Sequence, residues 1–460
     1  MNTARFAGYL TVAAALRHDL RRPLADLARF YESPPERQAA DRQRRLGELV
    51  RHAAATVPWY RDRVPERFRS ASADVDLTEL PILTKRDLRT SEAFLSEAYP
   101  RRSLTTTTTG GSTGEVTAVS RTVDELDRVR AHALLQYAWM GLSPDCREVA
   151  IVGADPARGR GLLGRASLRW LRTRELNLER VSPATMAATF AELRRHRPAF
   201  VWGYTSLLTE LARHVVESGI TPPQPQLMCN GAETLWESDR ALISRAFGAP
   251  VINRYGTTDI GVIGVECRPG SGLHLHDASV LVEVVRSGVP VRMGERGELL
   301  ITQLDNRAMP LIRFAIGDLG RLVDGPCACG RTGVRLVDLE GRTDDVLLAT
   351  GGARLSGLRV GHCMAAFPSI TRFQIVQRSP QVVDARLEIR SLDVATATRV
   401  QRALEEVFGP DVRVTIVWNG TFDLTPRNKF RRTMRLFPLE HPYCEPTSSS
   451  DHRHAAPPGP

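Results

Sequence analysis

The chain has 460 residues, of which 42% are hydrophobic and 25% are charged, and its formal net charge is +10. This length excludes a single small domain and predicts about two to four domains with a sizeable core. Acidic residues are interspersed with the basic ones, and no long basic block is present. This pattern argues against a nucleic-acid-binding tail.

The cysteines and the apolar segments indicate the compartment. Seven cysteines form an odd, scattered set, which fits a reducing environment better than a disulfide scaffold. The apolar run Phe6–Leu16 leads into a charged segment without a small-residue cleavage site, so we expect a helix and not a signal peptide. No apolar run is long enough to span a bilayer. We expect a cytoplasmic protein that binds neither a membrane nor nucleic acid.

Residues 1–100 are predicted to form helices with charged faces. The pattern is interrupted by prolines, namely Pro34, Pro35, Pro58, Pro65 and Pro81. A later helix start is expected at Thr84–Asp87 with Thr84 as N-cap. The chain has only two lysines, Lys85 and Lys429. We expect Lys85 to be a solvated residue of the first helical turn.

From residue 100 to 260, short apolar runs alternate with helical patterns. The predicted strands are Glu148–Ala154, Ala199–Tyr204, Leu227–Asn230 and Val251–Tyr255. The predicted helices between them are Met186–His196, Ser206–Gly219 and Asp239–Gly248. Such alternation predicts a largely parallel sheet, with ligands bound at the carboxyl ends of its strands.

The remaining chain is predicted to hold two smaller units. Residues 265–340 are rich in strand patterns and suggest an antiparallel subdomain. A small mobile α+β domain is expected over 342–440, followed by a disordered tail over 441–460. The predicted fold class is therefore α/β, with a large N-terminal domain over 1–341 that contains mostly parallel sheets and the β-rich subdomain.

A glycine-rich stretch, Thr105–Gly114, is the first candidate for chemistry. Its three glycines allow a tight turn, and its hydroxyls and clustered N–H groups could bind a polyphosphate. The stretch lacks the Gly-Lys-Ser/Thr ending of a P-loop, which argues against that class of nucleotide site. Taken alone, the stretch is better explained as a flexible Thr/Gly surface loop.

Five short motifs follow one another along the chain and precede Lys429. They are Thr109–Gly114 (TGGSTG), Gly231–Thr234 (GAET), Tyr255–Asp259 (YGTTD), Arg313–Asp318 (RFAIGD) and Gly341–Asp345 (GRTDD). This ordered series resembles the adenylate-forming enzymes, and within them the phenylacetate–CoA ligase-like branch, which includes capsule-biosynthesis adenylating homologues. The resemblance covers about residues 40–435. Its branch-specific parts are Leu49–Arg61, Leu80–Lys85, Thr302–Asp318 and Cys327–Arg331.

The resemblance implies an ATP site. The β- and γ-phosphates would be held by Thr109, Gly110, Gly111, Ser112, Thr113 and Gly114. The adenine would be bordered by Gly231, Ala232, Glu233 and Tyr255. Asp318 would accept hydrogen bonds from the ribose hydroxyls.

The resemblance also implies which groups surround the α-phosphate. Thr257 or Thr258 would contact it, with Gly256 beside them. Asp259 would occupy the position of the acidic Mg²⁺ ligand. The usual residue there is Glu, so the carboxylate of Asp259 reaches one methylene less far.

Three more residues complete the implied catalytic set. Adenylation joins two anions and expels pyrophosphate, so the protein must neutralise charge and align the reactants. Arg342 would contact the ribose or a phosphate, and Asp344 would lie at the hinge of the small domain. Lys429 would bridge the carboxylate and α-phosphate oxygens as a point charge. Two departures, Glu115 beside the phosphate loop and Asn428 in place of a glycine, put the rate in question.

A metal site is suggested by a second set of residues. Cys327 and Cys329 form a two-thiolate pair, and Cys267 with His274 could complete a tetrahedral Zn²⁺ site. His276 competes with His274 as the fourth ligand. Free cysteines in a β-rich subdomain are the alternative.

The acyl pocket is expected beside the nucleotide. It would be lined by Trp202, Tyr204 and Asn230, whose aromatic members could form a wall for an aryl acid or could equally be core residues. The sequence does not specify the acid.

The function expected from the resemblance is an ATP- and Mg²⁺-dependent ligase that makes an acyl adenylate and transfers the acyl group to coenzyme A. A carrier protein or an amine is the alternative acceptor. A catalytically weak nucleotide-binding homologue is a second alternative, and a nucleic-acid binder is a third. The protein is expected to be a monomer or a homodimer.

Overall fold

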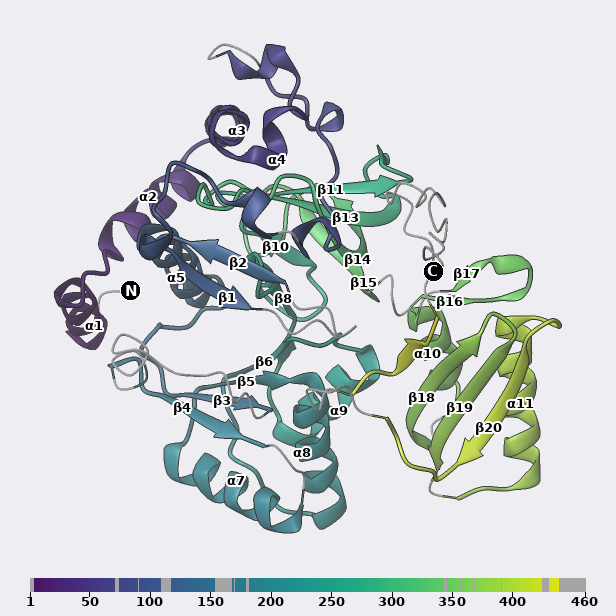
Figure 1. Ribbon diagram of the computed structural model, residues 1–460. Helices are drawn as coiled ribbons and strands as arrows, with labels where there is room; N and C mark the ends of the chain where they lie inside the picture. Colours follow the sequence, from purple (N-terminus) through teal and green to yellow (C-terminus); the bar gives the residue numbers. More distant parts are fainter. Residues whose placement is uncertain are drawn as a thin grey trace, which may run out of the picture.

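The computed structural model describes residues 4–70, 74–89, 91–108, 117–153, 168, 170–178, 182–342, 346–355, 357–367, 369–389, 391–423 and 430–437. Three large sheets organise these residues (Figure 1). They have five, eight and four strands, and two further pairs of strands lie outside them. No helix within the described ranges is long and apolar enough to cross a membrane. The predicted α/β fold class is confirmed.

The N-terminal segment is helical, as predicted. Its helices are α1 (Ala4–Ala15), α2 (Arg21–Glu32), α3 (Pro35–Thr56) and α4 (Pro58–Arg61). Its 3₁₀ turns are η1 (Glu66–Arg69), η2 (Leu77–Glu79), η3 (Asp87–Arg89), η4 (Ser91–Phe94) and η5 (Arg101–Ser103). Two of the prolines that interrupt the pattern start helices, because a first-turn position needs no N–H donor.

One prediction in this segment is wrong. The start at Thr84 leads only into the short turn η3, in which Thr84 and Asp87 bond each other. The Lys85 ammonium donates to the carbonyl of Ile316 at 2.7 Å, so it is a half-buried cross-link to strand β14 and not a solvated charge.

The five-stranded sheet has the order β4-β3-β5-β6-β7, and all its pairs are parallel. Its strands are β3 (Glu148–Val152), β4 (Thr173–Asn177), β5 (Phe200–Tyr204), β6 (Leu227–Gly231) and β7 (Val251–Ile252). The helices that accompany it are α5 (Val123–Trp139), α7 (Pro183–His196), α8 (Thr205–Ser218) and α9 (Glu237–Phe247). The predicted parallel sheet is therefore correct.

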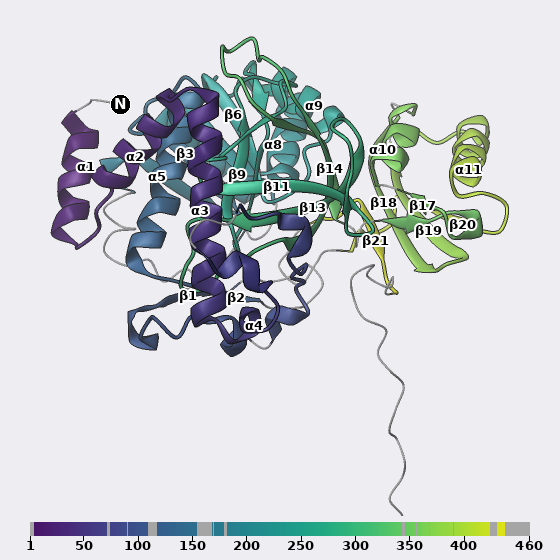
Figure 2. The ribbon, with the colours of Figure 1, turned by 90° about the horizontal axis from the view of Figure 1, so that it is seen from above.

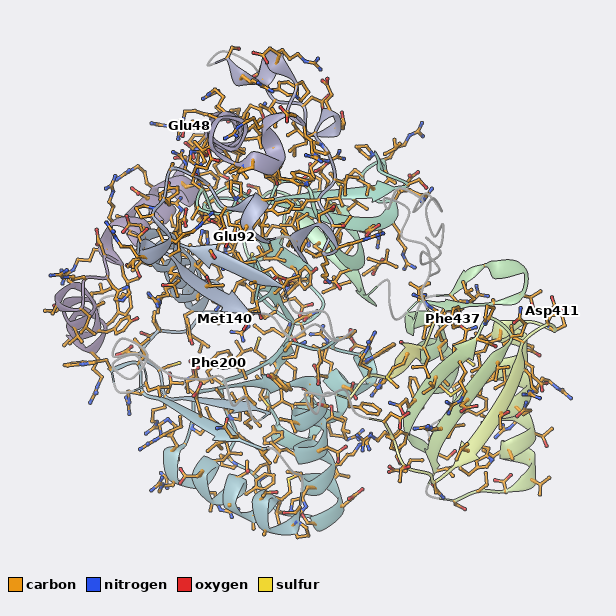
Figure 3. All side chains as sticks on the ribbon, viewed as in Figure 1. Glu48, Glu92, Met140, Phe200, Asp411 and Phe437 are labelled. Atoms are coloured by element: carbon orange, nitrogen blue, oxygen red, sulfur yellow. The ribbon has the colours of Figure 1, made fainter. Side chains whose placement is uncertain are left out.

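Alternation along the strands divides the core between the two faces of this sheet. Val201 and Met228 pack with α7, α8 and α9 on one face. Phe200 and Cys229 point to the other face, where α1, α2 and α5 cover them. Figure 3 marks Phe200 within the side chains that fill this layer. Strand β5 also approaches β3 closely, since a Cβ at Gly203 would lie 2.4 Å from the carbonyl oxygen of Ile151.

The eight-stranded sheet is antiparallel and has the order β12-β11-β13-β14-β15-β10-β9-β8. Its strands are β8 (Arg254–Thr257), β9 (Gly261–Glu266), β10 (Leu273–Leu275), β11 (Val280–Arg286), β12 (Val289–Pro290), β13 (Arg296–Gln303), β14 (Phe314–Val323) and β15 (Arg335–Arg342). A separate pair, β1 (Thr105–Thr108) and β2 (Ala118–Arg121), flanks the glycine-rich stretch. The predicted strand Val251–Tyr255 is divided at Asn253, where the chain passes from the parallel to the antiparallel sheet.

Described residues 346–437 form a C-terminal module with its own apolar core. Its sheet has the order β20-β19-β18-β21, with parallel outer pairs and an antiparallel central pair. Its elements are β16 (Leu347–Leu348), η7 (Thr350–Gly352), β17 (Arg354–Leu355), α10 (Gly357–Ala365), β18 (Ile370–Ser379), β19 (Val382–Ile389), α11 (Val394–Phe408), β20 (Arg413–Trp418) and β21 (Thr433–Arg435). Figures 1 and 2 show the module to one side of the remaining chain, beside α8 and α9.

Candidate active site

The GAET motif follows β6 and is held by helix α8. Ala232 has φ of 64°, which turns the chain sharply after the strand. The Glu233 carboxylate accepts hydrogen bonds from the backbone N–H of Ser206 at 2.7 Å and from its hydroxyl at 3.0 Å. It therefore caps the first turn of α8. Asn230 donates to the Glu233 carbonyl at 3.0 Å, so both ends of the loop are fixed.

The third and fourth motifs meet through one short hydrogen bond. The Tyr255 hydroxyl on β8 donates to Asp318 Oδ2 on β14 at 2.5 Å, and both side chains are buried. Asp318 pairs in register with Arg342 on β15, which brings the fifth motif to the same place. The sheet therefore gathers residues separated by more than sixty positions. The Arg342 side chain lies outside the described part.

Asp259 lies where the end of the glycine-rich stretch returns to the core. Its side chain is 5% exposed, and Oδ1 accepts a hydrogen bond from the Thr117 hydroxyl at 3.1 Å. Its carbonyl accepts from the Arg121 guanidinium. Burial lowers the pKa of Arg121. Arg121 was not among the predicted site residues, because its sequence context is an ordinary strand.

The threonines between Tyr255 and Asp259 have different environments. The Thr257 hydroxyl accepts from the backbone N–H of Ile260 at 3.2 Å, which stabilises the turn before β9. Gly256 and Thr258 are exposed. A Cβ at Gly256 would lie 2.5 Å from the carbonyl of Gly261, so this position requires glycine.

Trp202 is held by a buried carboxylate that the sequence analysis missed. The indole N–H donates to Glu148 Oε1 at 2.7 Å, and the Tyr137 hydroxyl donates to the other oxygen. Burial raises the pKa of Glu148. Arg254 stacks on the Trp202 ring at 4.4 Å. The only sequence signal for Glu148 was a charged residue at the start of an apolar strand.

The remaining two predicted pocket residues lie at neighbouring strand ends. Asn230 is 1% exposed and accepts from the backbone N–H of Arg254 at 3.2 Å. Tyr204 is half-buried, and its ring would lie 3.2 Å from a Cβ placed on Gly153. Asn230 therefore has a structural task in addition to the proposed pocket.

The four predicted zinc ligands form a cluster. The ligand atoms of Cys267, His274, Cys327 and Cys329 all lie within 4.8 Å of one another. Two of the separations are 3.7 Å between the Cys267 and Cys327 sulfurs, and 3.4 Å between the Cys329 sulfur and His274 Nε2. Tetrahedral zinc bonds of about 2.0–2.3 Å require ligand atoms about 3.3–3.8 Å apart. The residues present therefore fit the ion.

The surroundings of the cluster favour the thiolate form of Cys329 over that of Cys267. Burial raises the pKa of Cys267 to about 11 and lowers the pKa of His274 to about 4. Burial also raises the pKa of Cys329, but hydrogen bonds from Arg331 and the other two thiols outweigh it and bring the value to about 7. The competing ligand His276 lies outside the cluster, where it stacks on Trp139.

Some predicted site residues lie outside the described residues. They are Thr109, Gly110, Gly111, Ser112, Thr113, Gly114, Asp344 and Lys429. The described chain resumes at Thr117, which bonds Asp259, and at Phe430.

Two curated relatives and a solved structure are similar to this chain over most of its length. A phenylacetate–coenzyme A ligase of Thermus thermophilus is 28% identical over 449 residues, which cover 88% of this chain and 97% of the relative. A phenylacetate–coenzyme A ligase of Escherichia coli is 28% identical over 331 residues, which cover 69% of this chain and 74% of the relative. The 2-hydroxyisobutyryl-CoA ligase in its postadenylation state, in complex with R3-HIB-AMP, gives a TM-score of 0.73 at 20% identity. The match covers 89% of this chain and 91% of that structure.

The chain is similar in sequence to phenylacetate–coenzyme A ligases and has the fold of the adenylate-forming ligase structure. No family model matches it. The same hydroxyisobutyryl-CoA ligase, solved in the thioesterification state with 2-HIB-AMP and CoA, gives a lower TM-score of 0.60 at 21% identity, covering 89% and 91%. In this chain, the structure brings together Tyr255, Asp318 and the backbone of Arg342, and separately Thr117 with Asp259.

Proposed function

We propose that the chain is an acid–thiol ligase, which activates a carboxylic acid with ATP and transfers the acyl group to coenzyme A. The observation that carries this proposal is the Tyr255–Asp318 hydrogen bond, which joins two motifs of the adenylate-forming series in one buried polar site. The 28% identity to phenylacetate–coenzyme A ligases supports the same reaction class. The aromatic side chains of Trp202 and Tyr204 favour an aryl acid as the substrate.

The first half-reaction requires charge neutralisation more than acid–base chemistry. A carboxylate oxygen attacks the α-phosphorus of ATP, the bond from that phosphorus to the bridging oxygen breaks, and pyrophosphate leaves. Because both reactants are anions, Lys429 and Arg342 would lower the barrier by holding positive charge beside the oxygens that approach one another. Lys429 carries a compact charge on a flexible stem, which suits a contact with several oxygens.

The nucleotide would be held by groups that the fold already fixes. Asp318 would accept hydrogen bonds from the ribose through its second oxygen, while Tyr255 holds the first. The backbone after β6 would border the adenine, since the Glu233 carboxylate is already used in capping α8. Thr257 or Thr258 would contact the α-phosphate, and the loop before Thr117 would bind the outer phosphates.

Mg²⁺ would be bound beside these phosphates. Asp259 is a buried carboxylate that accepts from Thr117, and a carboxylate with phosphate oxygens and water is the ligand set that Mg²⁺ prefers. The ion would neutralise charge on the leaving pyrophosphate.

The second half-reaction transfers the acyl group. The thiol of coenzyme A loses its proton, its sulfur attacks the acyl carbon, and AMP leaves as the bond from that carbon to the phosphate oxygen breaks. We propose that the C-terminal domain, residues 342–440, turns about Asp344 relative to the N-terminal domain, residues 1–341, between the two steps. A carrier-protein thiol or an amine would replace coenzyme A in the alternative reaction.

Carboxylate-dependent exchange of labelled pyrophosphate into ATP tests the proposal. Across a panel of aryl and alkyl acids, we expect exchange with at least one acid, reduced at least about 100-fold by Lys429→Ala, because one preorganised charge is worth this much in a transition state. Arg413→Ala removes an exposed charge from the same module and should leave the rate unchanged. Adding coenzyme A then identifies the acceptor.

Two results would count against this account. Mg·ATP binding without exchange by any acid would favour the catalytically weak homologue. Failure to bind ATP at all would contradict the nucleotide site itself.

We further propose that the Cys₃His cluster binds a structural Zn²⁺ that joins β9, β10 and the Cys327–Cys329 turn. A reducing cytoplasm would keep these thiols available. Purified protein should contain about one zinc per chain, and Cys327→Ser should remove most of it and lower the melting temperature by several degrees, because binding of the ion adds directly to folding free energy. Elemental analysis and thermal unfolding measure both.

A matched cysteine variant controls for loss of a thiol. Cys363→Ser changes a half-buried cysteine of α10 outside the cluster and should keep the full zinc content. Metal-free protein that is as stable as the zinc-loaded form would contradict a structural role.

A further inference from the structure

We propose that two arginines of the C-terminal module, Arg372 and Arg432, form a clamp on helices α8 and α9 that positions the chain on both sides of Lys429 for adenylation. This inference rests on the proposed function and adds positioning residues to it. Each arginine is stacked on aromatic rings and paired with a carboxylate across the boundary between the module and the preceding chain.

Arg432 forms the first contact. Its Nη2 donates to Asp239 Oδ1 on α9 at 2.6 Å, and the two side chains are only 11% and 7% exposed. Its guanidinium lies 5.2 Å from the Trp236 ring centre, and 5.0 Å from that of Phe373. Nη1 also lies 3.4 Å from the Ser238 hydroxyl. Since burial raises the pKa of Asp239, this carboxylate depends on its cationic partner to remain charged.

Arg372 forms the second contact. Its Nη1 lies 3.4 Å from Glu210 Oε1 on α8, with side chains 23% and 25% exposed. Its guanidinium stacks on Phe422 at 4.8 Å and on Phe430 at 4.3 Å. These two phenylalanines stand on either side of Lys429 in the sequence, and Phe430 is its direct neighbour.

The chain after Lys429 is also tied to the module's sheet. The backbone N–H of Ile375 on β18 donates to the carbonyl of Arg432 at 2.7 Å, and the Gln374 amide donates to that of Arg431 at 3.0 Å. The chain from Phe430 to Arg432 is therefore fixed both to β18 and, through the clamp, to α8 and α9. This tie begins at the residue that directly follows Lys429 in the sequence.

The clamp belongs to one arrangement of the module. A Cβ at Gly361 on α10 would lie 2.2 Å from the Trp236 ring, so the two surfaces are in close contact. Turning the module would separate Arg432 from Asp239 and Trp236, and Arg372 from Glu210, while the rings of Phe422, Phe430 and Phe373 would move with it. The Arg432–Asp239 pair is largely buried, so loss of one partner would leave the other charge poorly compensated. The more exposed Arg372–Glu210 pair adds less.

Helix α9 connects the clamp to the nucleotide motif. It begins at Glu237, only four positions after Glu233, and Trp236 is its N-cap residue. The first turn of α9 therefore follows closely after the GAET loop in the sequence and contains Asp239, the partner of Arg432.

The experiment separates the two half-reactions in Arg432→Gln, Asp239→Asn, Glu210→Gln and the Arg432→Gln/Asp239→Asn double variant. Pyrophosphate exchange with phenylacetate as the probe acid reports adenylation, and transfer from supplied phenylacetyl adenylate to coenzyme A reports the second step. We expect exchange to fall about 10- to 50-fold in each variant, with little further loss in the double variant, while transfer stays within about twofold. Arg432→Lys should retain more exchange than Arg432→Gln.

Hydrogen–deuterium exchange gives a readout that needs no substrate. In Arg432→Gln, we expect residues 430–437 and the first turn of α9 to exchange at least about tenfold faster, with α11 unchanged. Arg378→Gln is the control, since it breaks a more exposed pair with Asp384 inside the module. It should alter neither measurement.

The failures are distinguishable. Equal loss of both half-reactions, or unchanged protection of residues 430–437, would overturn the clamp. No pyrophosphate exchange by the unmodified protein with any acid of the panel would instead count against the proposed function, and the deuterium measurement would still decide whether the clamp exists.

Discussion

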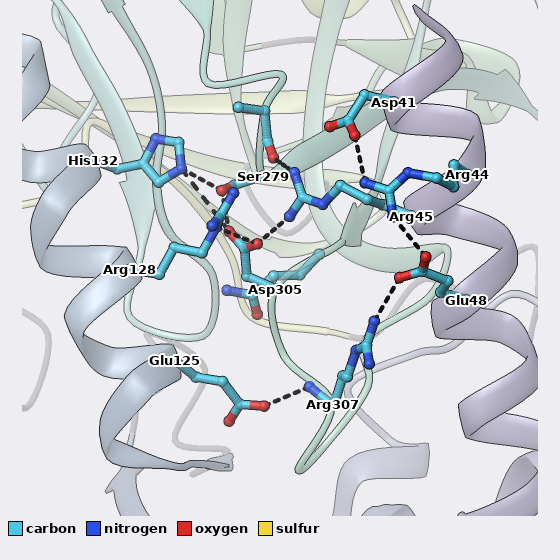
Figure 4. A network of polar contacts seen from close by, with 12 residues as sticks. Asp41, Arg44, Arg45, Glu48, Glu125, Arg128, His132, Ser279, Asp305 and Arg307 are labelled. Atoms are coloured by element: carbon cyan, nitrogen blue, oxygen red, sulfur yellow. Dashed lines mark hydrogen bonds and ion pairs between the residues drawn. The ribbon is translucent and has the colours of Figure 1, made fainter. Parts of the chain in front are cut away.

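Replacing Asp305 with alanine is expected to lower the free energy of unfolding by about 3–5 kcal/mol, because it leaves buried positive charges without a partner. The Asp305 side chain is 5% exposed and joins three segments of the chain (Figure 4). It pairs with Arg45 of α3, lies 2.6 Å from Arg128 Nε of α5, and accepts a hydrogen bond from Ser279. Urea denaturation at pH 7.5 measures the change.

Asp338 provides the matched control. It also pairs with two arginines, Arg321 at 2.7 Å and Arg296 at 3.4 Å, but its side chain is 35% exposed. Water replaces the lost contacts there, so Asp338→Ala should cost at most about 1 kcal/mol. If the two variants lost the same stability, the burial of Asp305 would not matter to its pairing.

The parallel sheet was predictable because its signals are local. The strand patterns at Glu148 and Phe200 alternate with amphipathic helices, and glycines mark the helix ends. Gly219 and Gly248 follow α8 and α9 with φ of 65° and 63°, a conformation that other residues adopt at a cost. Period, length and end signals therefore agree over this whole region.

Long-range contacts account for what the sequence did not show. The division of the predicted strand at Asn253 depends on which sheet each half pairs with, and nothing local distinguishes the halves. Lys85 looked like a first-turn residue until β14 supplied a carbonyl 231 positions away. Burial of a polar residue is a property of the folded chain, and local composition does not reveal it.

In the candidate site, too, residues with a local sequence signal could be predicted and residues defined by long-range contacts could not. Tyr255 and Asp318 could be proposed because each lies in a motif of a recognisable series, and the cysteine cluster could be proposed from ligand type alone. The partners that hold such residues were not proposed. Glu148 and the Arg432–Asp239 pair lie in ordinary sequence, and their meaning depends on the side chains that packing brings to them.

Stability is expected to fall steeply as the pH is lowered below about 6.5, because two buried histidines cannot take up protons in the folded state. His132 and His276 are 4% and 0% exposed, and their Nδ1 atoms lie 2.9 Å apart. Burial lowers the pKa of both well below the usual value; the charges of Arg128 and Arg45 add to this at His132, and His132 adds to it at His276. The carboxylate of Asp305 offers a compensating charge, at 3.9 Å from His132 Nε2 and through Ser279, but it already pairs with Arg45 and Arg128.

The sign follows from the proton count. Well above about pH 6.5, the two rings carry no additional proton in either the folded or the unfolded state. Below it, the unfolded chain binds two protons that the folded chain does not bind. The free energy of unfolding therefore falls by up to about 2.7 kcal/mol per pH unit. Buried carboxyls whose pKa is raised, such as Glu148 and Asp239, act in the opposite direction. The measurement is therefore the free energy of unfolding in urea, compared between the unmodified protein and His132→Gln. It is made at about pH 7.5, 6.5 and 5.5, which span the usual histidine pKa. The variant should lose about half of the slope, and a parent stability that stays flat or rises towards pH 5.5 with no difference from the variant would show that the pair accepts protons in the folded state.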